Sequence, residues 1–309
     1  MKDIKNKLNG NRAMSYKLFF YVLPGLLIVF LFNYFPIWGW LYAFFQYKPG
    51  KSLFDCTFVG LKNFKALFSN PVMVNNLLRV LKNTFGIHLL SYLFSPLPML
   101  FAIFLSELPS KRFKKVAQSL TTLPYFIGWV VVYTLFTSLL APNGAINNLC
   151  IKLGILEKSV NFLASGEHVW IKQVLIQLWK SIGWDSVIYF AAIAGIDQEL
   201  YEAAMMDGAS KLQRIWYITL PNLLNTFFVL LIIKIGNFLN TGYEQYMIFE
   251  NPMNKEAIEV LDLYVYNLGI GSGQISFSVA VGIMKSIVAF VLFFSANAIS
   301  KKVRGESVF

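Results

Sequence analysis

The sequence predicts an all-α integral membrane protein with six transmembrane helices and both termini in the cytoplasm. Hydrophobic residues make up 56% of its 309 residues and charged residues only 14%, whereas a soluble domain carries about 25% charged residues. Six apolar stretches are long enough, as helices of about 20 residues, to cross the hydrocarbon core of a bilayer. The basic residues are also divided unevenly between the connections. Two cysteines, Cys56 and Cys150, could pair with each other but cannot form a disulfide framework.

The predicted spans lie, in chain order, at 18–45, 77–105, 115–140, 169–194, 221–242 and 278–299. The first contains no charged residue and holds Pro24, Gly25 and Pro36, which membrane helices tolerate better than soluble helices do. It is longer than a signal-peptide core and lacks a small-residue cleavage site, so we expect it to be retained. We therefore expect a permanent six-span domain over 18–300, between a short tail at 1–17 and another at 301–309.

The distribution of lysine and arginine predicts the orientation. Of the 27 Lys and Arg residues, 14 lie in the two tails and in the second and fourth connections, and seven lie in the other connections. Because cytoplasmic connections carry the excess of positive charge, both tails are predicted to be cytoplasmic. The net charge of +11 is then mainly a topology signal, and we expect no nucleic-acid partner.

The motifs of several enzyme classes are missing. The sequence contains no phosphate-binding P-loop and no Gly-x-Ser-x-Gly nucleophile elbow. The histidines, His88 and His168, are 80 residues apart with no carboxylate or cysteine close in sequence, so no metal site is predicted. We predict no catalytic residue and no cofactor in this chain. An activity driven by ATP and magnesium would need another chain to bind them.

The fourth connection predicts a helical hairpin on the cytoplasmic side, at 196–221. Asp197 can cap the first helix, Gly208 permits a sharp turn, and Ser210 with Gln213 forms a capping box for the second helix. Pro221 suits the first turn of the fifth span. The apolar positions of the second helix are spaced for one helical face: Leu212, Ile215, Trp216 and Thr219. On physical grounds alone, such an amphipathic hairpin is also typical of a connector that lies on lipid headgroups.

The same residues carry a family resemblance. Glu202-Ala203-Ala204, then Asp207-Gly208-Ala209, then Ile218-Thr-Leu-Pro221 resembles the EAA loop of the membrane permeases of binding-protein-dependent ABC importers. Further segments are similar to the LplB-type carbohydrate branch of the maltose-type (MalF- and MalG-like) permeases: Trp179–Trp184, Gly242–Gln245, Leu263–Tyr266 and Val281–Ser286. Asp185 stands where that branch has a small residue.

The resemblance implies a type I ABC importer permease fold with cytoplasmic coupling helices. It implies that the hairpin docks on a cytoplasmic ATPase dimer and that Glu202 pairs with a basic residue of that partner. The residues that we expect to couple are Glu202, Ala203, Ala204, Asp207, Gly208, Ala209, Leu212 and Pro221. It further implies a second homologous permease, an extracytoplasmic solute-binding lipoprotein and an oligosaccharide or polysaccharide fragment as substrate, in a bacterial plasma membrane.

Charged residues inside the predicted spans suggest a cavity, because such residues are costly in lipid and face one another or water. The candidate cavity residues are Lys180, Trp184, Asp185, Tyr189, Lys234, Asn237, Asn240 and Lys285. One interpretation is that Asp185 pairs with a lysine to hold helices together. The other is that these residues line a substrate site near the membrane midplane. Three lysines against one aspartate then lead to the hypothesis of an acidic oligosaccharide.

Other functions remain open at this stage. The alternative within transport is an ABC permease for a peptide or a lipid-linked glycan. An intramembrane transferase would need paired carboxylates or a His/Cys site near an interface, which the sequence does not contain. A membrane scaffold without transport activity would not need the Glu202 to Gly208 spacing.

Overall fold

The computed structural model describes residues 17–304. Helices dominate them, and the described residues contain no β-strand beyond a single bridge between Phe45 and Phe58. The chain is helical from Lys17 to Phe44. The longer α-helices after it are α2 (Lys62–Ser69), α3 (Pro71–Leu93), α4 (Leu97–Ser106), α5 (Lys111–Thr122), α6 (Trp129–Leu140), α7 (Ala145–Lys152), α8 (Val169–Asp185), α9 (Val187–Ala194), α10 (Gln198–Met206), α12 (Leu220–Gly236) and α16 (Ile275–Arg304). The shorter ones are α11 (Lys211–Arg214), α13 (Glu244–Phe249), α14 (Lys255–Ile258) and α15 (Leu261–Tyr266).

The chain divides into two compact units. The first consists of the described parts of 1–67 together with 268–283, and the second of 68–267 together with the described parts of 284–309. In the first unit, Ala43, Ala280 and Ile283 form a small buried cluster. The Asn63 side-chain amide donates to the Ala43 carbonyl at 2.8 Å, and the Tyr47 N–H donates to Ser276 Oγ at 2.9 Å.

The second unit holds two larger apolar cores. One joins α3, α6 and α8 to the short helices α13 to α15, around residues such as Ile87, Val132 and Leu263. The other joins α4, α9 and α12, around Ala102 and Leu223. The helices of these two cores bury some of their apolar side chains against one another, while many other large apolar side chains on them are exposed. Exposed apolar surface of this extent is unusual in soluble proteins and is expected of helices that face lipid.

One close helix crossing depends on a glycine. At Gly183 in α8, a Cβ atom would lie 2.1 Å from the carbonyl oxygen of Thr121 in α5, far inside van der Waals contact. No other residue fits there without moving the backbone, so Gly183 sets how closely α5 and α8 approach.

Prolines divide two of the predicted spans. The span predicted at 77–105 bends between α3 and α4, where Pro96 interrupts the helix. The span predicted at 115–140 ends at Thr122, passes through a short 3-10 turn (Leu123–Phe126) and restarts at Trp129. The prediction of one continuous helix there was wrong, because Pro124 cannot donate a backbone hydrogen bond.

Two other spans also differ from their predicted ranges. The span predicted at 169–194 is divided at Ser186, whose hydroxyl donates to the Pro98 carbonyl at 2.8 Å. The span predicted at 221–242 ends at Gly236, so Asn237 and Asn240 lie in the turn after α12 and not within the helix.

Five helical segments among the described residues are long and apolar enough to cross a bilayer. They are Lys17–Phe44, Pro71–Ser106, Trp129–Lys152, Lys211–Gly236 and Ile275–Ser295. The segment containing α8 and α9, which holds Lys172, Lys180 and Asp185, is not among them. The count of six spans and the sides of the two termini remain predictions. The tail predicted at 1–17 lies outside the described residues except for Lys17, and the tail predicted at 301–309 lies outside them from residue 305 onward.

Candidate functional site

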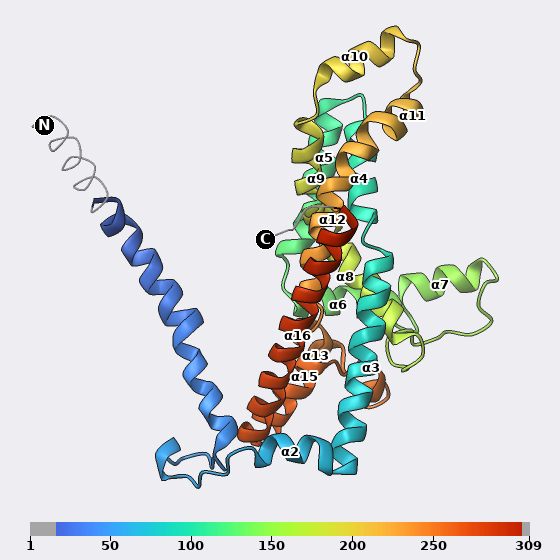
Figure 1. Ribbon diagram of the computed structural model, residues 1–309. Coiled ribbons are helices and arrows are strands. Elements are labelled where there is room, and N and C mark those ends of the chain that lie inside the picture. The colour runs from blue at the N-terminus through green and yellow to red at the C-terminus, as the bar shows by residue number, and fades with distance from the viewer. Residues whose placement is uncertain (1–16, 305–309) are drawn as a thin grey trace, which may run out of the picture. The chain divides into compact units, whose positions relative to one another are not determined.

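The hairpin predicted at 196–221 is present, as α10, a tight turn and α11. Asp197 caps α10 by accepting a hydrogen bond from the Glu199 N–H at 3.0 Å. Ser210 and Gln213 exchange both bonds of the predicted capping box, at 3.4 Å and 2.7 Å. Gly208 sits between the helices with a φ of +78°, a conformation that other residues adopt with strain. The hairpin extends beyond the ends of α4, α5 and α9, at one end of its unit (Figure 1).

The outer surface of the hairpin is exposed and available to a partner. Glu202, Ala203, Asp207 and Gly208 are exposed, and Ala204 and Ala209 are half-buried. Met206 at the tip is 89% exposed, which is unfavourable for an apolar side chain in water. The exposed carboxylate of Asp207 therefore lies next to the exposed side chain of Met206 at the tip of the hairpin.

Three apolar residues of the hairpin lie in different surroundings. Leu212 is 68% exposed. Ile215 packs on the core of α4, α9 and α12, and Met205 lines a cavity between the hairpin and those helices. The predicted helical face of the second helix was wrong in detail, because α11 ends at Arg214 and the chain widens into a π-helical turn, Ile215–Thr219. Pro221 occupies the first turn of α12, as predicted.

A cavity of about 360 Å³ lies among α3, α8 and α12, and it collects five of the eight candidate cavity residues. Those five are Trp184, Asp185, Lys234, Asn237 and Asn240. Tyr189 lines an adjoining cavity of about 250 Å³ that shares Trp184, Asp185 and Lys234. Further polar side chains of the larger cavity come from Ser91, Gln177 and Ser181. The walls therefore combine hydrogen-bonding groups with one ammonium and one carboxylate.

An aromatic pair forms one wall of this cavity. The rings of Tyr125 and Trp184 stack with centroids 4.7 Å apart and planes 6° from parallel, and both residues line the cavity. Tyr125 was missed by the sequence analysis. Its signal was the neighbouring Pro124, which breaks the helix and places the Tyr125 side chain against α8. Flat aromatic surfaces with polar groups nearby are suited to the apolar faces of sugar rings.

Lys180 lies outside this cavity, so the expectation that it lines the cavity was wrong. It is 8% exposed, and its ammonium donates to the carbonyls of Tyr125 at 2.6 Å and Pro124 at 3.3 Å. The same nitrogen lies 5.3 Å and 5.2 Å from the centroids of the Tyr125 and Trp129 rings. These carbonyls belong to the helix break at Pro124, where the Pro124 carbonyl also accepts from the Ile127 N–H at 3.2 Å. The Tyr125 carbonyl, like any backbone acceptor inside a membrane, needs a partner within the protein. Lys180 supplies it.

Lys285 was expected to line the cavity, but it also lies outside it. Its ammonium pairs with the carboxylate of Asp262. Asp262, which the sequence analysis did not single out, also accepts from the N–H of Gly242 at 2.9 Å and from the hydroxyl of Thr241 at 3.3 Å.

Asp185 is not paired with a lysine, contrary to the first of the two interpretations of the intramembrane charges. It accepts from Ser181 at 2.9 Å, and no ion pair forms at Asp185 or Lys234 within residues 17–304.

His88 packs against two aromatic rings. Its ring lies 4.9 Å from that of Phe238 and 5.9 Å from that of Tyr92, centroid to centroid. Its Nε2 atom is buried and has no hydrogen-bond partner in the described part of the chain. Between 17 and 304, no three His, Cys, Asp or Glu side chains are grouped so that they could hold a metal ion.

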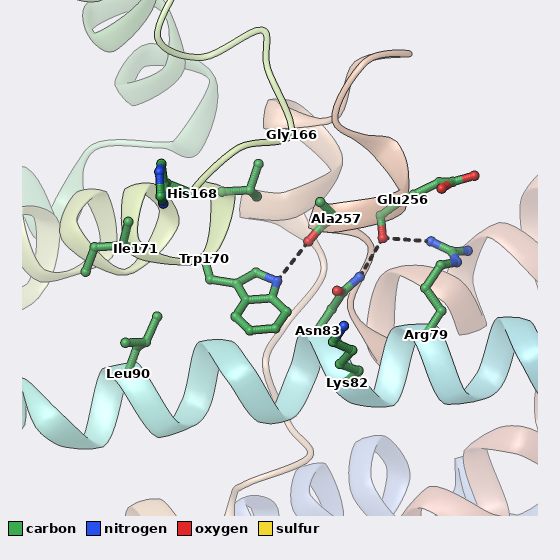
Figure 2. Close-up of a pocket in the computed structure, with 11 residues that line it drawn as sticks. Arg79, Lys82, Asn83, Leu90, Gly166, His168, Trp170, Ile171, Glu256 and Ala257 are labelled. Atoms are coloured by element: carbon green, nitrogen blue, oxygen red, sulfur yellow. Dashed lines mark hydrogen bonds between the residues drawn. The ribbon is translucent and has the colours of Figure 1, made fainter.

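A second cavity, of about 560 Å³, lies at the amino-terminal end of α8 and is shown in Figure 2. Asn83 and Arg79 of α3 both donate to the Glu256 carbonyl, at 2.8 Å and 3.0 Å. Trp170 donates to the Ala257 carbonyl at 3.1 Å. These bonds tie three separate segments together, so Asn83, Arg79 and Trp170 already have structural partners.

Comparison with known proteins now decides the family. The family model described as "Binding-protein-dependent transport system inner membrane component" matches residues 95–305. The chain belongs to this family. The chain is 38% identical to "Protein LplB" of Bacillus subtilis (strain 168), over 94% of this chain and 91% of that protein. It is 39% identical to the "Polygalacturonan/rhamnogalacturonan transport system permease protein YteP" of the same organism, over 100% and 95% of the two chains.

Solved structures agree with this assignment. A chain of a bacterial ABC transporter involved in the import of the acidic polysaccharide alginate superposes with a TM-score of 0.81 and 33% identity, over 96% of this permease and 99% of that chain. A chain of a bacterial alginate ABC transporter in complex with a pentasaccharide-bound periplasmic protein gives a TM-score of 0.83 at the same identity, over 96% and 98%. This permease thus has the type I ABC importer permease fold. It is a multi-pass protein of the bacterial plasma membrane, and a transporter subunit that is not itself catalytic.

Proposed function

We propose that this permease forms one half of the membrane pathway of an ABC importer for oligosaccharides or polysaccharide fragments. The observation that carries the proposal is the cavity of about 360 Å³, with the stacked Tyr125 and Trp184 on one wall and Lys234, Asn237 and Asn240 on another. Aromatic faces beside hydrogen-bonding side chains match the two surfaces of a sugar ring. A peptide or lipid-linked glycan as cargo is not favoured, because the YteP permease and both similar solved structures are named for polysaccharides.

The proposal includes six spans, with α8 and α9 together forming the fourth and with both termini cytoplasmic. Lys172, Lys180 and Asp185 lower the hydropathy of this segment, but Lys180 has partners within the protein. A segment that is sheltered by neighbouring helices can span a membrane with such charges. The domain limits follow from this topology: tails at 1–17 and 301–309 and a permease domain at 18–300.

The hairpin is the proposed site of coupling to an ATPase. It projects from its unit, and Glu202, Asp207 and Leu212 are exposed on it. Ala203, Ala204, Gly208 and Ala209 keep its surface shallow, and Pro221 fixes the start of α12. A cytoplasmic ATPase dimer would bind ATP and magnesium, and closure of the dimer would move the hairpin. A related second permease would complete the pathway, and a solute-binding lipoprotein would deliver the saccharide.

The substrate is proposed to be acidic, but on narrower grounds than the sequence suggested. Two of the three lysines that supported this hypothesis, Lys180 and Lys285, have partners in the protein. Lys234 is the lysine that lines the cavity. The similar permease and the similar solved structures are named for polygalacturonan and alginate, both of which carry carboxylates.

An uptake assay tests the proposal. Cells that express the complete transporter are given matched neutral and uronate oligosaccharides. The expected result is uronate uptake that depends on this permease and falls in Lys234→Met, while Lys115→Met, which removes an exposed lysine outside the cavity, leaves uptake unchanged. Equal transport of both sugars with no effect of Lys234→Met would remove the acidic substrate. Absence of any saccharide uptake would remove the carbohydrate function.

A further inference from the structure

A third cavity, of about 410 Å³, lies at the base of the hairpin and has no role in the function described so far. Its walls come from the end of α4, from α5, from α9 and from α10 and α11. The two cations that line it are Lys114 and Arg214, and the one carboxylate is Glu107. Neutral hydrogen-bonding groups come from Gln118, Gln198 and Tyr201.

One cation of this cavity has a buried donor without an acceptor, and neither cation has a counter-charge among the described residues. Arg214 Nε is buried and has no hydrogen-bond partner among residues 17–304. Neither Arg214 nor Lys114 forms an ion pair with Glu107, because the ion pairs of the described chain all lie elsewhere. Lys114 Nζ lies 5.9 Å from the centroid of the Phe190 ring, against the apolar side of the cavity. A buried donor without an acceptor is unfavourable, so an anion with several oxygens would stabilise this arrangement.

The position of the cavity indicates where that anion comes from. It lies where α4 and α9 end and the hairpin begins (Figure 1), which is the level expected for lipid headgroups. Trp216 and Tyr217, in the turn after Arg214, are 63% and 80% exposed, and these two residue types gather at membrane interfaces. On α5, Phe113 and Leu120 are exposed, as suits a helix with lipid along one side. Basic pockets between membrane helices on the cytoplasmic side are suited to anionic headgroups.

We propose that this cavity binds a phosphate group, presented by the headgroup of an anionic phospholipid of the cytoplasmic leaflet. Arg214 and Lys114 contact the phosphate oxygens, the guanidinium by its planar fork. Glu107 opposes binding, which keeps the lipid exchangeable. The site joins the coupling hairpin to the ends of α4, α5 and α9, so occupancy stiffens the base of the element that is proposed to dock on the ATPase. The choice of the cytoplasmic leaflet and this last point rest on the proposed function, and the anion site itself does not.

Lipid retention by the purified transporter tests the site. The full chain, expressed with the subunits that co-purify with it, is exchanged into vesicles of phosphatidylcholine with or without phosphatidylglycerol, and bound lipid is measured by native mass spectrometry. Arg214→Gln and Lys114→Gln should each lower retained phosphatidylglycerol by about fivefold. Lys115→Gln, a neighbouring exposed lysine, should have no such effect. Glu107→Gln should raise retention, a gain that misfolding cannot produce.

Other outcomes are equally decisive. If Lys115→Gln lowers retention as much as Arg214→Gln, or if Glu107→Gln does not raise it, the binding is a general effect of surface charge and the proposal is overturned. If inorganic phosphate binds in an Arg214-dependent way and displaces the lipid, the phosphate site stands and its source is soluble. Saccharide uptake measured on the same variants separates the two proposals, because loss of uptake without loss of lipid affects only the proposed function.

Discussion

The ammonium of Lys285 in α16 pairs with the carboxylate of Asp262 in α15, and the same carboxylate accepts the backbone N–H of Gly242. One aspartate thus connects a membrane helix to the turn that follows α12. That turn carries Asn237 and Asn240, which line the candidate cavity. The pair is 15% exposed on either side, so its charges are largely removed from water.

Breaking this pair from one side should be strongly destabilising. Asp262→Asn leaves the Lys285 ammonium without a counter-charge, and the expected loss is about 3 kcal/mol of unfolding free energy. The double variant Asp262→Asn with Lys285→Met should recover much of that loss, because no buried charge is then left unpaired. Thermal unfolding in detergent measures both. Additive effects of the two substitutions would show that they do not interact.

Lys180 should stabilise the protein without selecting its substrate. Lys180→Met removes the donor to the Tyr125 and Pro124 carbonyls, and we expect a loss of about 1–3 kcal/mol. Lys180→Arg retains donors and should lose less. The ratio of uronate to neutral uptake should be the same in Lys180→Met as in the unchanged protein. A shift in that ratio would mean that Lys180 contacts the substrate.

Gly208 should be required for coupling because of its left-handed backbone conformation, and not because a side chain there would clash with its neighbours. A Cβ atom there meets nothing within 4 Å, but φ is +78°. Gly208→Ala should weaken transport moderately, since the left-handed conformation costs an alanine about 1–2 kcal/mol. Gly208→Pro cannot adopt this φ and loses the hydrogen bond from the Gly208 N–H to the Met205 carbonyl, so it should abolish transport. Uptake is compared with the amount of permease in the membrane, and full uptake by Gly208→Pro would exclude coupling through this turn.

The stability should also depend on pH through Glu250. Burial raises the pKa of the Glu250 carboxyl, although Lys255, 3.6 Å away, opposes the shift. A raised folded-state pKa means that stability is full below the unfolded pKa and falls as pH rises through the folded pKa. Glu250→Gln should remove this fall, which begins as the pH rises above the ordinary glutamate pKa of about 4.3.

The Lys255→Met variant provides the matched control for that prediction. It removes the group that lowers the Glu250 pKa, so the fall in stability should become larger than in the unchanged protein. Thermal unfolding as a function of pH measures both variants. An identical pH dependence in all three proteins would show that Glu250 does not contribute.

Local patterns in the sequence were sufficient to predict the two helices of the hairpin and to indicate the family. The capping residues Asp197 and Ser210 and the turn at Gly208 act within a few residues of themselves, so their bonds could be predicted without tertiary contacts. The Glu202–Ala209 spacing is local as well, and the comparisons confirmed the family that it indicated. The existence of apolar spans followed from composition, but the positions of their breaks at Pro96, Pro124 and Ser186 were not predicted.

By itself, the sequence determined that this is a helical membrane protein with a projecting hairpin of a known transporter family, because hydropathy and capping are properties of neighbouring residues. Only the tertiary structure decided which intramembrane charges are available. Lys180 and Lys285 looked equivalent to Lys234 along the chain, yet Lys180 donates to the Tyr125 and Pro124 carbonyls at a helix break and Lys285 pairs with Asp262, 23 residues away. The partner of a buried charge is set by helix packing, since a charge in an apolar surrounding takes whatever opposite group the fold brings within reach.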